Sequence, residues 1–322
     1  MQPEPGGRQA GHGLAALEPG HRALIGHGVP DCAVLAAGFA RQGVEAGEPV
    51  SVAVCPPLGR ELRRELGGHP LVSFFDMADL GRNPARIIAA MLDFARQHPG
   101  GRLRYISEPV WAGRPPAEQA EAARHEALVD QALADRALAG GGGATVLCVY
   151  QLAGLEPLAA SCGWQAHRML VAGGRPQASP AYAGQGVIPA PYDQPLPAPP
   201  AGAVCLRYRA DLRPVRAAVS AGAAAVRLPD GRASDLVLAV SEVAANTLRY
   251  ASGGGTLHIW SAGDELICQV SDSGTISDPL AGRRRPASDA SGYGLWLVNQ
   301  VCDLAELRSG PGGTTVRMHV RF

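Results

Sequence analysis

Apolar residues in the first half of the chain fall into short runs that alternate with segments of helical periodicity. The runs PVSVAVC from Pro49, LVSFFDM from Leu71, RLRYISEPV from Arg102 and ATVLCVY from Ala144 predict buried strands. The intervening segments 31–44, 61–66, 84–97 and 116–139 predict helices. This alternation is typical of a mainly parallel sheet covered by helices, so we predict an α/β fold for this half.

The last third of the chain shows a different order of elements. Segments 212–227 and 234–251 have helical periodicity, and GTLHIWSAG and ELICQVSDSG then predict an antiparallel pair joined at Gly263-Asp264. A third helix is expected from about residue 292 to 302, and LAELRSG and TTVRMHVRF predict a second hairpin. This order favours a two-layer α+β fold with helices on one face of a mixed sheet.

Residues 171–203 separate these two patterns. This stretch is rich in Pro, Gly and Ala and has no helical periodicity, so it predicts an extended linker. We therefore divide the chain into a disordered tail (1–20), an N-terminal domain (21–170), the linker (171–203) and a C-terminal domain (204–322).

Composition narrows the classes of function. The formal net charge is zero, which does not indicate a nucleic-acid or membrane partner, and no apolar run reaches the roughly 20 residues of a membrane span. The N-terminal residues lack the apolar core of a signal peptide, which predicts a cytoplasmic location. Lysine is absent, which excludes a GxxxxGK[ST] phosphate loop. The seven scattered cysteines contain no CxxC pair and favour reduced core thiols over disulfides or a zinc site.

Glu242 and Asn246 form the first candidate binding motif. They are four residues apart in a predicted helix, so both project from one face. An asparagine carbonyl is a suitable ligand for nucleotide-bound Mg²⁺, and the carboxylate can take a proton from an attacking hydroxyl. An ordinary solvent-facing pair would have the same spacing.

Two later segments add groups that a nucleotide pocket needs. Asp272 ends an apolar strand and can accept a hydrogen bond from an adenine amino group, while Gly274 allows close approach of a flat base. Gly292 and Gly294 precede an apolar helix whose N-terminal N–H groups can hold phosphate. The run Arg283-Arg284-Arg285 lies in a segment that could form a flexible lid over the phosphates. A strand-ending turn and a solvated basic loop are the ordinary alternatives for the Asp272 segment and the arginine run.

In this order the motifs resemble a known family. The segment from about Arg207 to Phe322 resembles the GHKL, or Bergerat-fold, ATPase domain in its anti-sigma regulatory form, related to bacterial anti-sigma-factor serine kinases. The resemblance implies Mg-ATP binding, with Glu242 as the catalytic base and Asn246 on the metal. It places the other ATP-binding residues at Arg249, Asp272, Gly274, Gly292, Gly294, Leu295 and Thr314. Tyr250 stands where many relatives have histidine.

The N-terminal half resembles a second family, the MEDS sensory domain. The resemblance rests on RQGVEAGEPVSVAV, FFDMADLGRNPARIIAAMLDFA, ISEPVWAGRPPAEQAEAARHEALVDQAL and LCVYQ. It implies a RecA-like three-layer α/β fold that senses a small molecule. Gln151 stands where relatives usually have Asp, which changes any ligand contact made there.

Four residues are candidates for a sensory pocket in this half: Glu108, Trp111, His125 and Glu126. Each also has an ordinary explanation. Trp111 could be a core residue, Glu108 could belong to a turn before Pro109, and His125 with Glu126 could form a solvated helix face.

These observations predict a cytoplasmic signalling regulator. Its C-terminal module would be an ATP-binding anti-sigma factor that binds a sigma factor, or that acts as a kinase on Ser/Thr of an anti-anti-sigma (STAS) partner, under control of the N-terminal sensor. Related anti-sigma kinases suggest a homodimer. A non-enzymatic, ATP-gated binding module remains an alternative. A sensor histidine kinase is the weaker alternative, because no histidine lies between Met169 and Leu257.

Overall fold

The structure is a computed structural model of the chain and describes residues 18–138, 142–286 and 292–322. It separates into two compact units, 1–193 and 194–322. Most of the predicted tail lies outside the described residues. Among the described helices, none combines the length and the apolar character that a membrane span requires.

The first unit is built on a seven-stranded sheet with the order β3-β2-β4-β5-β1-β6-β7. All pairs are parallel except β6 with β7, which are antiparallel. The strands are β1 (Gly20–Gly26), β2 (Val50–Val54), β3 (Val72–Asp76), β4 (Leu103–Ser107), β5 (Ala144–Gln151), β6 (Met169–Ala172) and β7 (Arg175–Ala178). The helices are α1 (Val29–Glu45), α2 (Pro56–Leu66), α3 (Met77–Leu80), α4 (Ala85–Gln97), α5 (Pro116–Leu138) and α6 (Pro157–Gln165), and a 3₁₀ turn η2 covers Ala190–Tyr192.

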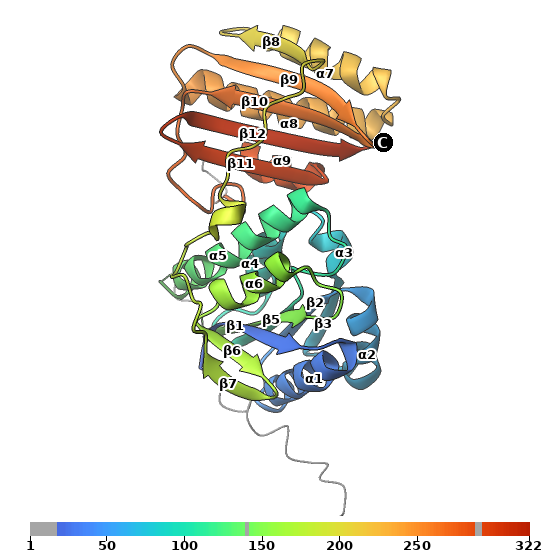
Figure 1. Cartoon of the computed structure of the whole chain (residues 1–322), viewed down its shortest axis with the longest axis vertical. Coiled ribbons are helices and arrows are strands. Elements are labelled where there is room, and N and C mark those ends of the chain that lie inside the picture. The colour runs from blue at the N-terminus through green and yellow to red at the C-terminus, as the bar shows by residue number, and fades with distance from the viewer. Residues whose placement is uncertain (1–17, 139–141, 287–291) are drawn as a thin grey trace, which may run out of the picture. The chain divides into compact units, whose positions relative to one another are not determined.

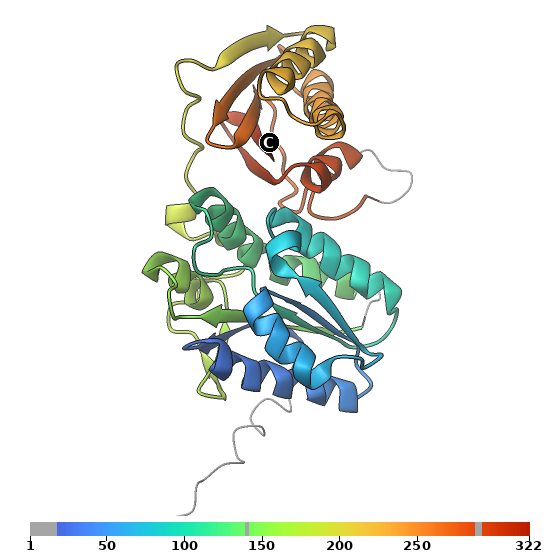
Figure 2. The same ribbon diagram turned by 90° about the vertical axis from the view of Figure 1, so that its right-hand side faces the viewer.

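Helices cover both faces of this sheet (Figures 1 and 2). An apolar core lies on each face of the sheet. Successive residues of β1 pack alternately into one core and the other, because neighbouring strand residues point to opposite faces. Leu24 packs with α1 and α2, whereas Ala23 and Ile25 pack with α4, α5 and α6. The predicted three-layer α/β arrangement is therefore confirmed.

The second unit has two layers (Figure 2). Its sheet has the order β11-β12-β10-β9-β8, and helices α7, α8 and α9 pack on one face around a single apolar core. The strands are β8 (Val204–Tyr208), β9 (Gly255–Ala262), β10 (Glu265–Asp272), β11 (Leu304–Gly310) and β12 (Gly313–Arg321), and the helices are α7 (Arg213–Ala225), α8 (Asp230–Tyr250) and α9 (Tyr293–Val301). The predicted two-layer α+β fold is confirmed.

The second sheet differs from the sequence prediction in one respect. We expected a mixed sheet, but every strand pair that the structure describes in this unit is antiparallel. The unpredicted strand β8 pairs antiparallel with β9 and forms the outer edge. Three of its five residues are exposed, so its apolar pattern is weak.

The segment predicted as a linker begins inside the first sheet. Val171 and Ala172 complete β6, and 175–178 form β7. All four residues of β7 are exposed, and one is Pro176, which an edge strand tolerates because its N–H is not needed in the ladder. No apolar alternation marks such a strand, so the sequence pattern did not reveal it.

The described cysteines are all free. Six of them are buried and Cys205 is exposed.

Gly313 holds the β11–β12 turn against the end of β10. Its φ is +112°, and an ideal Cβ there would lie 2.1 Å from the backbone oxygen of Asp272. Gly313→Ala would combine backbone strain with this clash, so we expect a loss of at least about 2 kcal/mol in the free energy of unfolding. Urea denaturation measures the loss. Gly312→Ala is the matched control, because a Cβ there meets nothing within 4 Å. Equal stabilities of the two variants would contradict the prediction.

Candidate functional site

Helix α8 positions the first predicted motif. Its buried residues, among them Leu236, Val240 and Val243, form the stripe that packs into the domain core. Glu242 and Asn246 lie beside this stripe, one turn apart and partly buried. Among the described residues, no side chain or backbone group hydrogen-bonds to either of their side chains.

The glycine segment at the start of α9 lies directly against this motif. An ideal Cβ on Gly294 would lie 3.1 Å from Glu242 Oε2 and 3.2 Å from Asn246 Nδ2. A side chain at position 294 would therefore press on both groups. The fold brings together two motifs that are about 50 residues apart in the sequence.

A cavity of about 830 Å³ opens beside these residues. Its walls come from α8, the end of β10, the 274–286 segment, the start of α9 and β12. Six predicted ATP-binding residues line it: Asn246, Asp272, Gly274, Gly292, Leu295 and Thr314. Glu242, Arg249 and Gly294 are not among the lining residues. Arg249 is exposed, and its guanidinium lies 5.8 Å from the Tyr250 ring centroid.

The Asp272 carboxylate is fixed at this cavity by hydrogen bonds. Its Oδ2 accepts from the Thr247 hydroxyl at 2.6 Å, and its Oδ1 accepts from the Gly274 N–H at 2.8 Å. Thr314 donates from its hydroxyl to the Gly274 carbonyl at 2.8 Å. Sequence reasoning missed Thr247, because its place one residue after Asn246 does not reveal the hydrogen bond to Asp272.

The three arginines of the predicted lid have different surroundings. Arg284 and Arg285 line the cavity, whereas Arg283 is buried. Arg284 pairs with Asp278 at 2.8 Å, and Arg285 lies 5.6 Å from the Trp296 ring centroid.

The described part of this segment is anchored to the domain. Leu280 is fully buried, and the Asn299 amide donates to the Gly282 carbonyl at 2.9 Å. Residues 287–291 of the predicted lid lie outside the described residues.

Glu242 lines a second hollow, of about 640 Å³, between α7 and α8. Arg216, Ser241 and Leu238 also line this hollow. Asn246, one helical turn after Glu242, lines the larger cavity instead. A group entering the hollow could therefore reach Glu242 while a ligand occupied the cavity.

The four predicted sensory residues are held by different neighbours in the first unit. Glu108 accepts from the backbone N–H of Cys55 at 2.7 Å and from the Gln151 amide. Burial raises the pKa of Glu108 to about 7, although these hydrogen bonds act to lower it. Trp111 packs on the core, and the Arg114 guanidinium lies 3.9 Å from its ring centroid.

His125 and Glu126 are both buried in α5, so the explanation of a solvated helix face is wrong. His125 Nε2 lies 3.7 Å from Glu126 Oε1. The Glu126 carboxylate also accepts from the Tyr150 hydroxyl at 2.8 Å and lies 3.0 Å from His167 Nε2. The carboxylate therefore belongs to a polar cluster inside the core.

Each half of the chain matches the model of a known protein family. Residues 207–320 match the model of the histidine kinase-like ATPase domain, and residues 20–168 match MEDS, the methanogen/methylotroph, DcmR sensory domain. The chain joins a MEDS domain to a histidine kinase-like ATPase domain. A comparison with curated proteins finds no match.

A crystal structure of the RsbU and RsbW domains of Rv1364c from Mycobacterium tuberculosis is similar to part of the chain. It shares 22% identity over 38% of this chain and 33% of that chain, with a TM-score of 0.30. The chain thus spans about a third of that protein. A TM-score this low supports no statement about fold or function.

Gly294→Ala tests the contact between the two motifs of the ATPase domain. The added methyl would push on Glu242 and Asn246, so we expect Mg-ATP affinity to fall at least about tenfold, or about 1.4 kcal/mol. Isothermal titration calorimetry measures the affinity. Gly231→Ala, also on a helix of this domain, is the control because a Cβ there meets nothing within 4 Å. A Gly294→Ala protein with unchanged affinity would refute the prediction.

Glu108 gives the MEDS domain a defined pH dependence. The folded pKa of about 7 exceeds the ordinary value of 4.5, so the folded state binds this proton more tightly than the unfolded state does. The free energy of unfolding therefore falls as the pH rises from about 4.5 to about 7, because over this range the unfolded state loses the proton that the folded state keeps. Glu108→Gln has no such carboxyl. Between pH 4.5 and 7, the difference in the free energy of unfolding between this variant and the wild type should therefore change in favour of the variant by on the order of 3 kcal/mol.

Urea denaturation at a series of pH values measures this difference. The control is Glu156→Gln, which removes an exposed carboxyl from the same domain. Wild-type and Glu108→Gln curves that stay parallel from pH 4.5 to 7 would contradict the assignment.

Proposed function

We propose that the ATPase domain binds Mg-ATP in the 830 Å³ cavity. Its volume falls within the range of small-molecule sites, and the residues present fit the ligand. Asp272, held by Thr247 and Gly274, would accept from the adenine amino group. Thr314, which is hydrogen-bonded to Gly274, would close the same end of the site.

The opposite side of the cavity carries groups suited to phosphates and a metal. Asn246 would ligate Mg²⁺ through its amide oxygen, for which the described residues supply no competing partner. The N–H groups at the start of α9 and the arginines at 284 and 285 would face the negative charge. When bound, Mg-ATP supplies a transferable phosphoryl group whose charge the metal neutralises.

We further propose that the protein is a cytoplasmic anti-sigma regulator. In this proposal it binds a sigma factor or phosphorylates Ser/Thr of a STAS-domain partner, and the MEDS domain controls it by sensing a small molecule. The observation that carries the kinase proposal is that Glu242 lines the α7–α8 hollow one helical turn from Asn246, which lines the cavity. A partner hydroxyl entering the α7–α8 hollow would meet this carboxylate, which can accept its proton.

One observation favours a second function, that of an ATP-gated binding module without turnover. Glu242 lines the outer hollow rather than the cavity, so it could contact a bound partner directly. In that case ATP would set the shape of the α7–α8 surface and no phosphate would be transferred.

Two substitutions in α8 separate binding from transfer. Asn246→Ala removes the metal ligand, so Mg-ATP affinity should fall on the order of 100-fold, or about 3 kcal/mol, in calorimetry. Glu242→Gln keeps the side-chain size but removes the base, so binding should persist while transfer falls about 10²- to 10⁴-fold. Asp235→Ala, an exposed acid on the same helix, is the control for both.

Intact-mass spectrometry of the protein with Mg-ATP and STAS-domain proteins from the same genome measures transfer. One phosphate on a partner Ser or Thr, lost in Glu242→Gln, is the expected result. Measurable ATP binding without transfer to any partner would support the binding module instead. Wild-type Mg-ATP affinity in Asn246→Ala would refute the site itself.

A further inference from the structure

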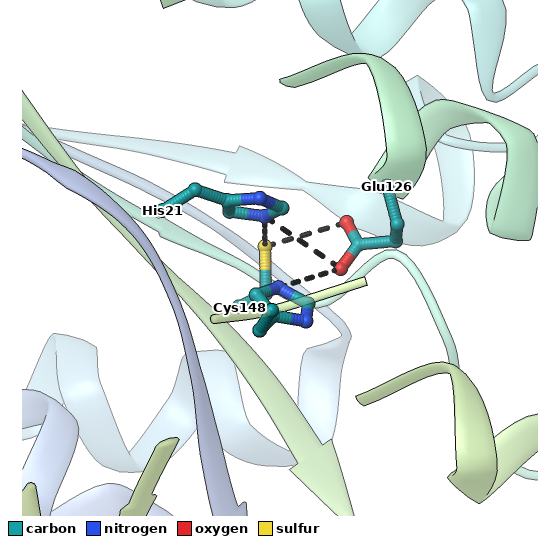
Figure 3. A group of neighbouring side chains, drawn as sticks. His21, Glu126 and Cys148 are labelled. Carbon is teal, nitrogen blue, oxygen red and sulfur yellow. Dashed lines mark hydrogen bonds and ion pairs between the residues drawn. The ribbon is translucent and has the colours of Figure 1, made fainter. Parts of the chain in front are cut away.

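Four buried side chains of the MEDS domain converge at one point (Figure 3). His21 comes from β1, Cys148 from β5 and Glu126 from α5, as Figure 3 labels them. His167 lies in the segment between α6 and β6. Each side chain is at most 5% exposed. Each offers one atom that could bind a metal ion, and these four atoms all lie within 4.8 Å of one another. Residues spread over nearly 150 positions of the chain thus direct their polar atoms into the same part of the core.

Several distances between polar atoms of these residues are close to the spacing of ligands around one ion. His21 Nε2 lies 3.2 Å from Cys148 Sγ, Cys148 Sγ lies 3.4 Å from Glu126 Oε1, and Glu126 Oε2 lies 3.0 Å from His167 Nε2. In a tetrahedral zinc site, metal–ligand bonds of about 2.0–2.3 Å place neighbouring ligand atoms roughly 3.3–3.8 Å apart. Small side-chain adjustments would therefore complete such a site.

The outer nitrogens of both imidazoles point away from the cluster toward acceptors. His167 Nδ1 lies 3.0 Å from the Gly163 carbonyl, and a carbonyl can only accept, so this nitrogen carries the proton. His21 Nδ1 lies 3.9 Å from the Asp130 carboxylate. Metal-binding histidines are oriented in this way, with the second nitrogen directed to a carbonyl or carboxylate.

Without an ion, the other ring nitrogen of His167, Nε2, has no hydrogen-bond partner. In the neutral imidazole this Nε2 is an acceptor, yet it faces the Glu126 oxygen, another acceptor, and makes no hydrogen bond. A cation between them, or a second proton on His167, resolves this contact. Tyr150 meanwhile orients the carboxylate by donating to Glu126 Oε2.

We propose that His21, Glu126, Cys148 and His167 form a site for a divalent transition-metal ion, best matched by Zn²⁺. Two imidazoles, one thiolate and one carboxylate are ligands that zinc accepts in tetrahedral geometry. A 2+ ion with one thiolate and one carboxylate is electrically neutral, as a fully buried site requires. Four protein ligands leave no open position, so the ion is structural and ties α5 and the turn before β6 to the strands β1 and β5.

Metal analysis of the purified full-length protein tests this proposal. Inductively coupled plasma mass spectrometry measures the metal content. We expect close to one zinc per chain, either in the protein as purified or after Zn²⁺ alone has been added and the excess removed. Cys148→Ala should lose the ion. Cys32→Ala is the matched control, because it removes another fully buried thiol of the same domain that lies in the core on the opposite face of the sheet.

Cobalt substitution tests the ligands without depending on a variant that could fail to fold. Co²⁺ added to metal-free wild-type protein should produce a thiolate-to-cobalt charge-transfer band and the visible absorption of four-coordinate cobalt. Glu126→Gln, which retains a partner for Tyr150, should weaken Co²⁺ binding, and the Cys32→Ala spectrum should match the wild type. Wild-type protein that retains no zinc and shows no charge-transfer band would overturn the proposal, and so would a band that persists in Cys148→Ala.

Discussion

Burial of the apolar stripe of α8 is the constraint on which the nucleotide site depends. Leu236, Val240 and Val243 pack into the core of the ATPase domain, and this packing sets the rotation of the helix about its axis. A helix has one rotation at which its apolar stripe is buried, so Glu242 and Asn246 are directed toward α9 as a consequence. The site is thus positioned by hydrophobic burial along α8, and Val243 of this stripe also lines the cavity.

The same packing explains why small residues are needed nearby. With α8 fixed, α9 approaches so closely that a methyl group at position 294 would lie 3.1 Å from Glu242 Oε2 and 3.2 Å from Asn246 Nδ2. Gly313 has a similar role at the other end, where the β11–β12 turn passes close to the backbone of Asp272. Both glycines bring main-chain atoms close to the groups that line the cavity.

In the MEDS domain the corresponding constraint is electrostatic. A carboxylate buried as deeply as Glu126 is costly unless it is paired, and its environment supplies a tyrosine hydroxyl, a thiol and imidazoles. Glu108 has fewer partners, which explains why its pKa is raised by burial. The two acids thus have different hydrogen-bond partners because the neighbouring strands and helices present different groups to them.

Sequence pattern was sufficient for much of this molecule. Helical periodicity placed α1, α4, α5 and α7, and the ordered motifs around Asn246, Asp272 and Thr314 identified residues that line one cavity. The pattern missed the buried central strand β1 as well as strands whose burial is one-sided or absent. The exposed edge strand β7 and the partly exposed β8 carry little apolar signal, and Thr247 looks like any helical threonine until Asp272 is placed beside it.

The sequence by itself determined the two fold classes, the order of the nucleotide motifs and the exclusion of a lysine-dependent phosphate loop, because these depend on local periodicity and residue identity. Only the tertiary structure decided which distant residues meet. His21, Glu126, Cys148 and His167 have no characteristic spacing, and they converge because the order β5-β1-β6 and the packing of α5 bring them to one point. Likewise, the packing of α9 on α8 brings Gly294 close to Glu242 and Asn246, which no local pattern encodes.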